Sequence, residues 1–293
     1  MKKVPLITKF DPWKSTLCTC PPKLTLNPYT GCDHGCLYCY ASSYIPQFHQ
    51  CRPKTDLLSK LKKEAAKLDG QLISLSNSSD PYPTIEDKTL TTRKTLETLT
   101  HSNCKLQIIT KSTLVTRDID LLRRVPSIVS ITITTDNDAT AKQLEPHAPT
   151  STQRIRTAET LTQKGILTTI RIDPIIPTLN DNHEKLIKTL AAIGIKHVTA
   201  STYKTKPDNW KRLAKTLPET AEKLKPLYYE HGERLGNCTY LPRELRLKLL
   251  KNIRDLADKH DIKFGTCREG LSQLNTATCD GQWLLRERVI SSS

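Results

Sequence analysis

The sequence has no long apolar stretch. No run approaches the length of about eighteen apolar residues that a membrane span needs, and no apolar segment lies near the N-terminus. Internal repeats, low-complexity segments and Gly/Ser-rich spacers are also missing, so no separate domain on a flexible linker is expected. We therefore expect a cytoplasmic protein without a membrane partner.

The charge is strongly positive. Lys and Arg number 45 against 30 Asp and Glu, a net charge of +15 in a chain of 293 residues. This balance favours polyanionic partners, nucleic acid above all, although the surface lysines of a thermophile would produce it as well. The length suits either one α/β barrel or two smaller domains, and it leaves the oligomeric state open.

Cysteine is frequent for a chain with no expected secretory signal. Ten cysteines in a mid-sized intracellular protein favour metal binding or catalysis over disulfides. The stretch NPYTGCDHGCLYCYA (27–41) holds Cys32, Cys36 and Cys39 in the spacing Cys-x3-Cys-x2-Cys. A loop this short can place three thiolates around one centre.

The metal at this loop is open from spacing alone. Gly31 and Gly35 ease the turns that such a loop requires. Zinc would want a fourth ligand, for which His34 is the local candidate, whereas an iron–sulfur cluster could leave one iron free for a substrate.

Short apolar runs alternate with amphipathic segments up to about residue 204. The apolar runs predict strands at 24–30, 71–76, 105–110, 127–135, 166–173 and 196–202, and the amphipathic segments predict helices over 55–68, 88–99, 117–124, 152–164 and 183–193. This βα alternation indicates parallel strands with right-handed crossovers, either in a doubly wound sheet or in a closed or partial barrel. Long helices over 209–217, 219–235 and 243–260 and a short strand at 262–266 follow.

The cysteine loop resembles a known family. GCDHGCLYCY is similar to the cluster-binding loop of radical S-adenosylmethionine (SAM) enzymes. In that family three cysteines hold three irons of a 4Fe-4S cluster and the fourth iron binds SAM, which explains why there are three. The resemblance implies a partial (β/α)6 TIM-like barrel and an external electron donor of the flavodoxin or ferredoxin type.

Further motifs are similar to the subgroup related to spore photoproduct lyase, namely SLSNSSDPYPTIE, ITKS and RIDPIIPTLND. The resemblance implies contacts of SAM with Tyr38 or Tyr40 near the adenine, with Ser76, Ser79 and Asp80 near the amino group, and with Lys111, Thr132, Thr134 and Arg154 near the carboxylate or ribose. Asp80 is equally suited to cap the turn before Pro81, and Tyr38 or Tyr40 to lie in the core. Asn77 stands where the photoproduct lyases carry a hydrogen-donating cysteine, so the same lesion chemistry is not expected.

Four other cysteines suggest a second site. Two lie before the first strand and two near the C-terminus, and together they could form a second iron–sulfur or zinc site if the ends of the fold meet: Cys18, Cys20, Cys267 and Cys279, with Cys238 in reserve. Scattered structural thiols are the alternative.

The C-terminal third is rich in basic residues, interleaved with Tyr203, Trp210, Tyr228 and Tyr229. Basic and aromatic side chains together suit nucleic acid, although helix faces of a basic protein look alike. We predict three segments, 1–24, a barrel over 25–203 and a helical extension over 204–293.

The predicted function is a radical SAM enzyme that acts on a nucleic-acid base. The alternatives are a radical SAM enzyme for a small metabolite or peptide, and a zinc-stabilised nucleic-acid-binding protein without redox chemistry.

Overall fold

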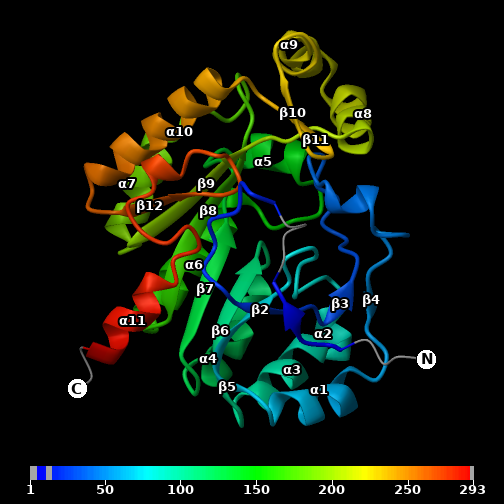
Figure 1. The fold of residues 1–293 in the computed structure, drawn as a ribbon, viewed down its shortest axis with the longest axis vertical. Coiled ribbons are helices and arrows are strands. Elements are labelled where there is room, and N and C mark those ends of the chain that lie inside the picture. Colours follow the sequence, from blue (N-terminus) through cyan, green and yellow to red (C-terminus); the bar gives the residue numbers. More distant parts are fainter. Residues whose placement is uncertain (1–4, 11–14, 291–293) are drawn as a thin grey trace.

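The computed structural model describes residues 5–10 and 15–290, and within these ranges an eight-stranded, mostly parallel sheet forms the centre (Figure 1). The strand order is β1-β2-β5-β6-β7-β8-β9-β12. The strands are β1 (Thr8–Lys9), β2 (Leu24–Leu26), β5 (Asp69–Leu75), β6 (Asn103–Thr110), β7 (Ser127–Thr132), β8 (Leu167–Ile175), β9 (His197–Thr202) and β12 (Lys263–Thr266). The six predicted strands and the partial-barrel class are therefore confirmed.

The two ends of the chain supply the edges of this sheet. β12 pairs in parallel with β9, from Lys263 opposite His197 to Thr266 opposite Ala200, while β1 pairs antiparallel with β2. The late strand, which the sequence suggested for the C-terminal extension, thus adds a seventh parallel strand to the barrel. The three-segment division stays a prediction, and residues 1–4, 11–14 and 291–293 of it lie outside the described residues.

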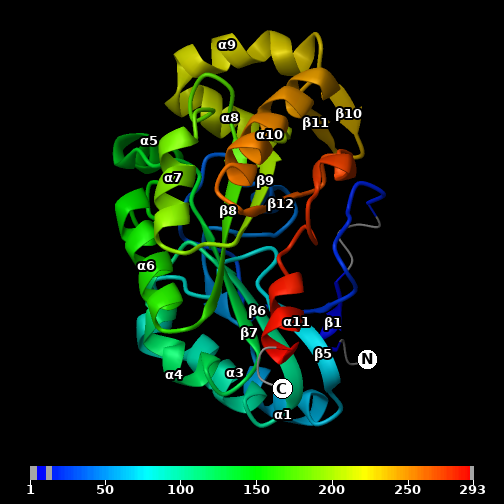
Figure 2. The ribbon, with the colours of Figure 1, turned by 90° about the vertical axis from the view of Figure 1, so that its left-hand side faces the viewer.

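Helices connect the parallel strands. They are α1 (Leu57–Ala65), α2 (Glu86–Thr89), α3 (Thr91–Leu99), α4 (Ile119–Leu122), α5 (Asp138–Leu144), α6 (Ser151–Gln163) and α7 (Glu184–Ala192). Figure 2 shows α4, α6 and α7 on one side of the sheet, with the C-terminal α11 (Trp283–Ile290) on the other. The helix predicted over 88–99 is interrupted at Leu90, whose φ of 52° is left-handed, and α5 was not predicted.

The C-terminal helices are α8 (Pro207–Thr216), α9 (Pro218–Tyr229) and α10 (Arg243–Asp258). α9 ends earlier than predicted because the chain turns back at Gly232, where a Cβ atom would lie 2.2 Å from the Tyr228 carbonyl oxygen. Residues Glu233–Leu235 then form β10, which pairs with β11 (Cys238–Tyr240). No helix in the described ranges is both long and apolar enough to cross a membrane.

The strands are buried on both faces, as parallel strands in a barrel are. Alternate residues such as Ile108, Val129 and Ile170 belong to the apolar core. The residues between them are small and polar yet also buried, namely Ser74, Gln107, Ser130, Thr169 and Thr199. They bond to each other and to the terminal segments, which explains the alternating threonines of the sequence.

Two short pieces flank the cysteine loop. β3 (Tyr29–Thr30) pairs antiparallel with β4 (Arg52–Pro53), so the loop that carries the three cysteines is closed at its base. This loop begins directly after β2, at the carboxyl edge of the parallel sheet, where such folds place their ligand sites.

Candidate active site

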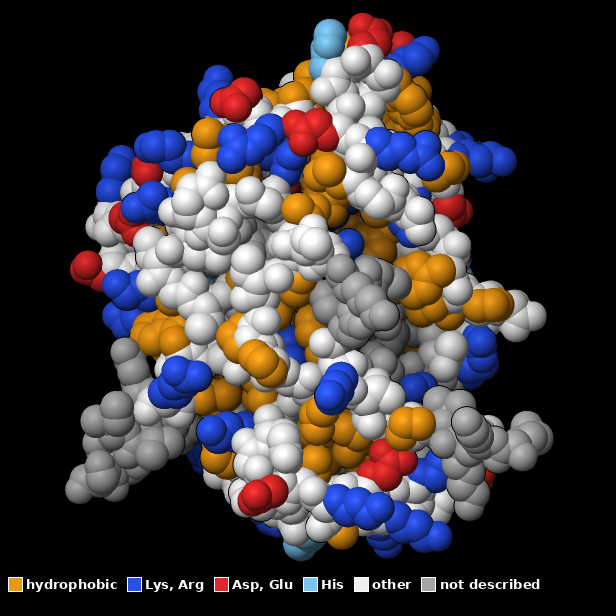
Figure 3. Space-filling model, viewed as in Figure 1, with side chains coloured by type: hydrophobic (Ala, Val, Ile, Leu, Met, Phe, Trp, Pro, Cys, Tyr) orange, Lys and Arg blue, Asp and Glu red, His pale blue; other side chains and the backbone are white. Residues whose placement is uncertain are grey.

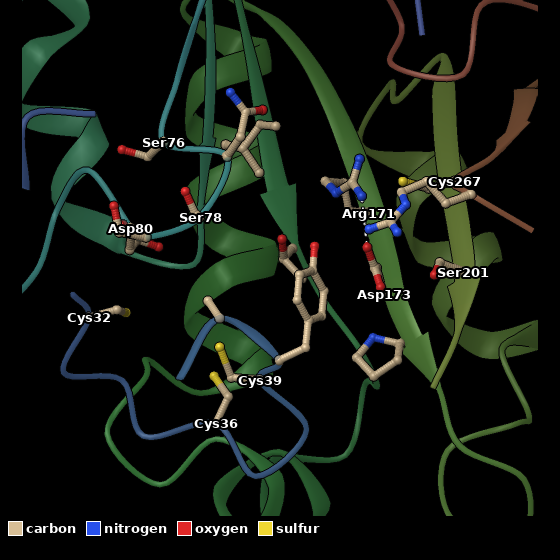
Figure 4. Close-up of a pocket in the computed structure, with 18 of the residues that line it drawn as sticks. Cys32, Cys36, Cys39, Ser76, Ser78, Asp80, Arg171, Asp173, Ser201 and Cys267 are labelled. Atoms are coloured by element: carbon tan, nitrogen blue, oxygen red, sulfur yellow. Dashed lines mark hydrogen bonds and ion pairs between the residues drawn. The ribbon is translucent and has the colours of Figure 1, made fainter. Parts of the chain in front are cut away.

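A cavity of about 450 Å³ opens at the carboxyl edge of the sheet. Its walls come from the loops that follow each parallel strand, and they include Cys32, Cys36 and Cys39. Figure 4 shows these three cysteines on one wall, with Arg171, Asp173 and Cys267 on the wall across the cavity.

The conformation of the cysteine loop depends on its two glycines. Gly31 has a φ of +84°, and a Cβ atom there would lie 2.3 Å from the Phe48 carbonyl oxygen. Gly35 has a φ of +68°, with the ring of His147 2.8 Å from the same position. A side chain fits neither site, and L-residues with side chains rarely adopt this backbone. The two glycines therefore let the loop turn tightly enough to present all three thiols.

The three thiols suit an iron–sulfur cluster. Burial raises the pKa of Cys36 to about 12, and burial also raises the pKa of Cys32 and Cys39. Neutral thiols are the form expected before metal binding, which deprotonates them. Among the described residues, no three His, Cys, Asp or Glu side chains converge closely enough for a single metal ion. A cluster does not require such convergence, because each thiolate binds a different iron.

Tyr38 joins this loop to a buried carboxylate that was missed in the sequence. Its hydroxyl donates to Glu145, which also binds Arg154 and accepts a hydrogen bond from Thr134 Oγ1 at 3.2 Å. Arg154 is fully buried and donates further to the carbonyl oxygens of Pro149 and Thr132, both at 2.9 Å. The structure thus places Thr134 and Arg154 behind the cavity wall, where they hold the cysteine loop.

No motif in the sequence singles out Glu145. It is the C-cap residue that follows α5, a helix that the apolar pattern did not predict, and it lies 107 positions from Tyr38 in the sequence. Backbone bonds strengthen the same junction, with Leu37 N to Leu144 O at 2.9 Å and His147 N to His34 O at 3.1 Å.

Lys111, which is predicted to approach the carboxylate of SAM, lines the cavity. Its Nζ lies 5.5 Å from the centre of the Tyr38 ring. Burial acts to lower the pKa of Lys111, but the Cys36 and Glu145 side chains outweigh it, so the pKa lies above its usual value. The cavity therefore holds a protonated amine beside the cysteine loop, where a carboxylate could bind it.

The other residues predicted to contact SAM differ in whether their polar atoms already have hydrogen-bond partners within the protein. Ser76 has a φ of 63°, and its buried Oγ has no hydrogen-bond partner although it lines the cavity. Asp80 is occupied, because it accepts from Tyr82 N at 2.9 Å, Thr110 Oγ1 at 2.6 Å and Lys111 N at 2.8 Å. Asp80 thus caps the turn before Pro81 and fixes the position of Lys111. Tyr40, Ser79 and Thr132 also line the cavity.

The wall across the cavity carries two ion pairs that the sequence did not single out. Arg171 Nη2 lies 2.7 Å from Asp173 Oδ2 at the end of β8, and Lys204 Nζ lies 2.7 Å from Glu269 Oε1. Burial acts to raise the pKa of Asp173, but the Arg171 and Lys204 charges outweigh it and lower that pKa. The sequence pattern that could have indicated these residues is the occurrence of charged residues near the ends of buried strands, in RIDP and STYK.

The predicted second set of cysteines comes together in part. Cys20 Sγ and Cys279 Sγ lie 3.2 Å apart, and Cys18 interacts with Cys20. Cys20, Cys267 and Cys279 line the cavity, whereas Cys238 lies in β11 and does not.

Comparison with known proteins gives the same family as the cysteine loop. The profile of the Radical SAM superfamily matches residues 26–190. An uncharacterized protein of Methanocaldococcus jannaschii is 35% identical over 166 residues, 54% of this chain and 62% of that protein, so the chain spans less than two thirds of that relative. A protein of Pseudomonas phage M6 named radical SAM Nalpha-GlyT isomerase is 26% identical over 83% of this chain and 53% of its own length.

Solved structures show the same fold. Spore photoproduct lyase complexed with dinucleoside spore photoproduct superposes with a TM-score of 0.62 at 17% identity, covering 79% of this chain and 71% of that chain. The radical SAM methyltransferase TsrM from Kitasatospora setae, with tryptophan substrate, superposes with a TM-score of 0.57 at 14% identity, covering 91% and 58%.

Proposed function

The chain belongs to the radical SAM superfamily and is a radical SAM enzyme, and on this premise we propose that it acts on a base of DNA or RNA, modifying or repairing it. Membership implies a 4Fe-4S cluster and SAM, which when bound supply a 5′-deoxyadenosyl radical that abstracts hydrogen from a substrate. We assign the cluster to Cys32, Cys36 and Cys39. One observation carries the assignment: these three thiols, of which Cys36 is buried and the other two are partly buried, line one cavity together with Lys111 and with the unpartnered Ser76 hydroxyl.

The residues around the cluster loop have distinct proposed roles. Lys111 and the Ser76 hydroxyl bind the carboxylate and amino groups of SAM, and Tyr40 packs near its adenine. Asp80 positions Lys111 through the backbone N–H that it accepts at 2.8 Å. Glu145 and Arg154 are positioning residues. They hold Tyr38 and thereby fix the loop between Cys36 and Cys39.

Cations support an anionic substrate such as nucleic acid. Arg171, Lys204 and Arg268 line the wall across from the cluster loop. Spore photoproduct lyase, of similar fold, has been solved with a dinucleoside spore photoproduct. Outside the cavity, Tyr229 is 59% exposed and packs edge-on against Trp210 at 5.0 Å, which offers an aromatic surface for stacking.

The outer surface favours a second candidate. On the face shown in Figure 3, Lys and Arg are dispersed among acidic and uncharged side chains instead of forming a stripe. Tyr203 and Tyr228, which the sequence suggested for nucleic-acid contact, are buried. Dispersed charge is what a radical SAM enzyme for a small metabolite or peptide would show.

The test begins with anaerobic reconstitution with iron and sulfide. Wild type is expected to bind about four irons per chain and to form 5′-deoxyadenosine from SAM under dithionite, whereas Cys36→Ala forms none. Cys104→Ala, at the start of β6 and away from the cavity, is the matched control and retains activity. A wild-type protein that yields no 5′-deoxyadenosine would refute the proposal.

Two further points are decided by the same preparation. A nucleic-acid substrate is supported if single-stranded or duplex oligonucleotides raise the rate of 5′-deoxyadenosine formation and peptides do not, and the reverse result supports the second candidate. The second cluster at Cys18, Cys20, Cys267 and Cys279 stays a prediction, for which about eight irons per chain would be the evidence. Flavodoxin and ferredoxin are the donors to compare with dithionite.

A further inference from the structure

Two thiols that are not needed for the cluster face the same cavity. Cys20 precedes β2 and Cys279 follows β12, and their sulfur atoms lie 3.2 Å apart although 259 positions separate them. Cys279 is 3% exposed and Cys20 is half-buried, and both line the cavity with the cluster cysteines. The pair therefore lies where a substrate radical would form.

The surroundings hold the pair in place from both sides. Lys23 Nζ lies 2.7 Å from Asp280 Oδ2, with side chains 2% and 3% exposed, so a buried ion pair joins the segment after Cys20 to the residue after Cys279. Gln107 of β6 donates to the Asp280 carbonyl at 2.9 Å, and Thr199 of β9 donates to the Cys279 carbonyl at 2.7 Å. The two termini are thus tied to the sheet interior at this point.

The distance between the sulfurs suits a dithiol better than a metal site. Thiolates on one tetrahedral zinc lie about 3.8 Å apart, given the Zn–S bond of about 2.3 Å. Cys18 interacts with Cys20, but no three His, Cys, Asp or Glu side chains within the described residues form a group that could hold a metal ion. A disulfide bond is about 2.05 Å long, so its formation would bring the two sulfurs closer by roughly 1 Å.

We propose that Cys20 and Cys279 form a redox-active dithiol that donates a hydrogen atom to the product radical and closes to a disulfide. This inference rests on the proposed radical chemistry. Thiol S–H bonds are weaker than the C–H bonds of bases and sugars, so a carbon radical in the cavity takes hydrogen from a thiol.

The step balances as follows in atoms and electrons. One S–H bond breaks and one C–H bond forms, which leaves a thiyl radical. The second thiol loses its proton and bonds to the thiyl sulfur, and the extra electron of that bond passes to a one-electron acceptor of the iron–sulfur class. The dithiol has then lost one hydrogen atom, one proton and one electron, and an external dithiol reduces the disulfide before the next cycle.

The experiment uses SAM alone, because the substrate is not identified. Reconstituted wild type, with its thiols reduced and excess reductant removed, is given SAM and dithionite in D2O. Its thiols then carry deuterium, and the 5′-deoxyadenosyl radical itself is the carbon radical in the cavity. We expect a single deuterium in the 5′-deoxyadenosine and a Cys20–Cys279 disulfide in the peptide mass spectrum. Each of the single variants Cys20→Ser and Cys279→Ser loses the disulfide, the double variant Cys20→Ser/Cys279→Ser loses both signals, and Cys104→Ala retains both.

A second measurement, which does not require cleavage of SAM, tests the dithiol independently of the deuterium assay. Mild oxidation by diamide is expected to link Cys20 to Cys279 in wild type, as peptide mass spectrometry would show. Variants are compared only if they bind the same iron and have the same circular dichroism as wild type.

The outcomes separate the two proposals. Unlabelled 5′-deoxyadenosine in wild type, equal labelling in Cys20→Ser/Cys279→Ser, or a second cluster lost with Cys20 and Cys279 would overturn the dithiol while leaving the radical function intact. Absence of 5′-deoxyadenosine in wild type would overturn the proposed function and the dithiol role with it.

Discussion

His197 is fully buried in β9, and its two ring nitrogens have different partners. Nδ1 accepts from the Trp283 indole at 3.1 Å, so the neutral ring carries its proton on Nε2, which lies 3.2 Å from Thr199 Oγ1. Thr199 in turn donates to the Cys279 carbonyl. Burial lowers the pKa of His197 to about 4. The neutral ring therefore links α11 to the segment that carries Cys279.

This pKa predicts acid sensitivity. In the unfolded chain His197 titrates near about 6.5, above its folded value of about 4, so between these values the unfolded state binds more protons and stability falls as the pH falls. From pH 7 to pH 5 this contributes a loss on the order of 2 kcal/mol. Urea unfolding at both pH values should show a smaller loss in His197→Gln than in wild type. The exposed His101→Gln is the control, and equal losses in all three proteins would contradict the assignment.

Glu145 decides at the residue scale whether the cysteine loop is held. In Glu145→Gln the fully buried Arg154 loses its carboxylate partner, and an uncompensated buried charge costs about 3–5 kcal/mol. Chemical denaturation should show this loss together with reduced iron binding, whereas Glu222→Gln on the exposed side of α9 should match wild type. The double variant Glu145→Gln/Arg154→Met should recover part of the stability. An unchanged midpoint in Glu145→Gln would refute the role.

At the scale of elements, β12 adds residues from the C-terminal part of the chain to the cavity. As the seventh parallel strand it brings the C-terminal loop, with Cys267, Arg268 and Cys279, to the cavity formed by the first six. The approach is close, since a Cβ atom on Gly265 would lie 2.6 Å from the Cα of Cys279. Only a glycine in β12 lets the two backbones pack at this distance.

Gly265→Ala should therefore push the Cys279 segment away from β12. We expect a loss of about 1–3 kcal/mol from overpacking and slower formation of the Cys20–Cys279 disulfide under diamide. Gly165→Ala, where nothing lies within 4 Å of the added Cβ, has a φ of +74° and tests backbone strain alone. It should lower stability without changing the rate of disulfide formation. Equal rates in wild type and Gly265→Ala would refute the packing argument.

At the scale of the whole molecule, charge and shape give separate information. The net charge of +15 attracts polyanions from a distance, but the cations that face a substrate are those inside the cavity. Of the aromatic residues suggested for stacking, Tyr229 is exposed and Tyr203 and Tyr228 hold the helical extension together. Under the proposed nucleic-acid function, Tyr229 and the neighbouring Trp210 mark the surface that a single strand would cross.

Binding of a labelled single-stranded oligonucleotide should weaken as salt rises, because bound phosphates release counterions. Fluorescence anisotropy between 50 and 200 mM salt should show a loss of about tenfold or more. Tyr229→Ala should cost about 1–3 kcal/mol of binding, and Lys211→Gln/Lys215→Gln on α8 should flatten the salt dependence. Lys62→Gln/Lys63→Gln on α1 is the charge-matched control. Binding that ignores both salt and Tyr229 would contradict a nucleic-acid partner at this surface.

Local patterns in the sequence were sufficient for much of this protein. Apolar periodicity predicted the parallel strands, and the spacing of Cys32, Cys36 and Cys39 with two glycines predicted a three-thiol site at the carboxyl edge of the sheet. These features depend on residues that are close together in the sequence, so they can be predicted without knowledge of the tertiary structure.

Only the tertiary structure decided the remainder. It turned Arg154 toward Glu145, behind the cavity wall, and it joined β12 to β9. It also brought Cys20 to Cys279 and Lys23 to Asp280 across more than 250 positions. Such pairs form because packing of the sheet closes the chain on itself, and no periodicity in the sequence encodes which distant side chains then share one buried space.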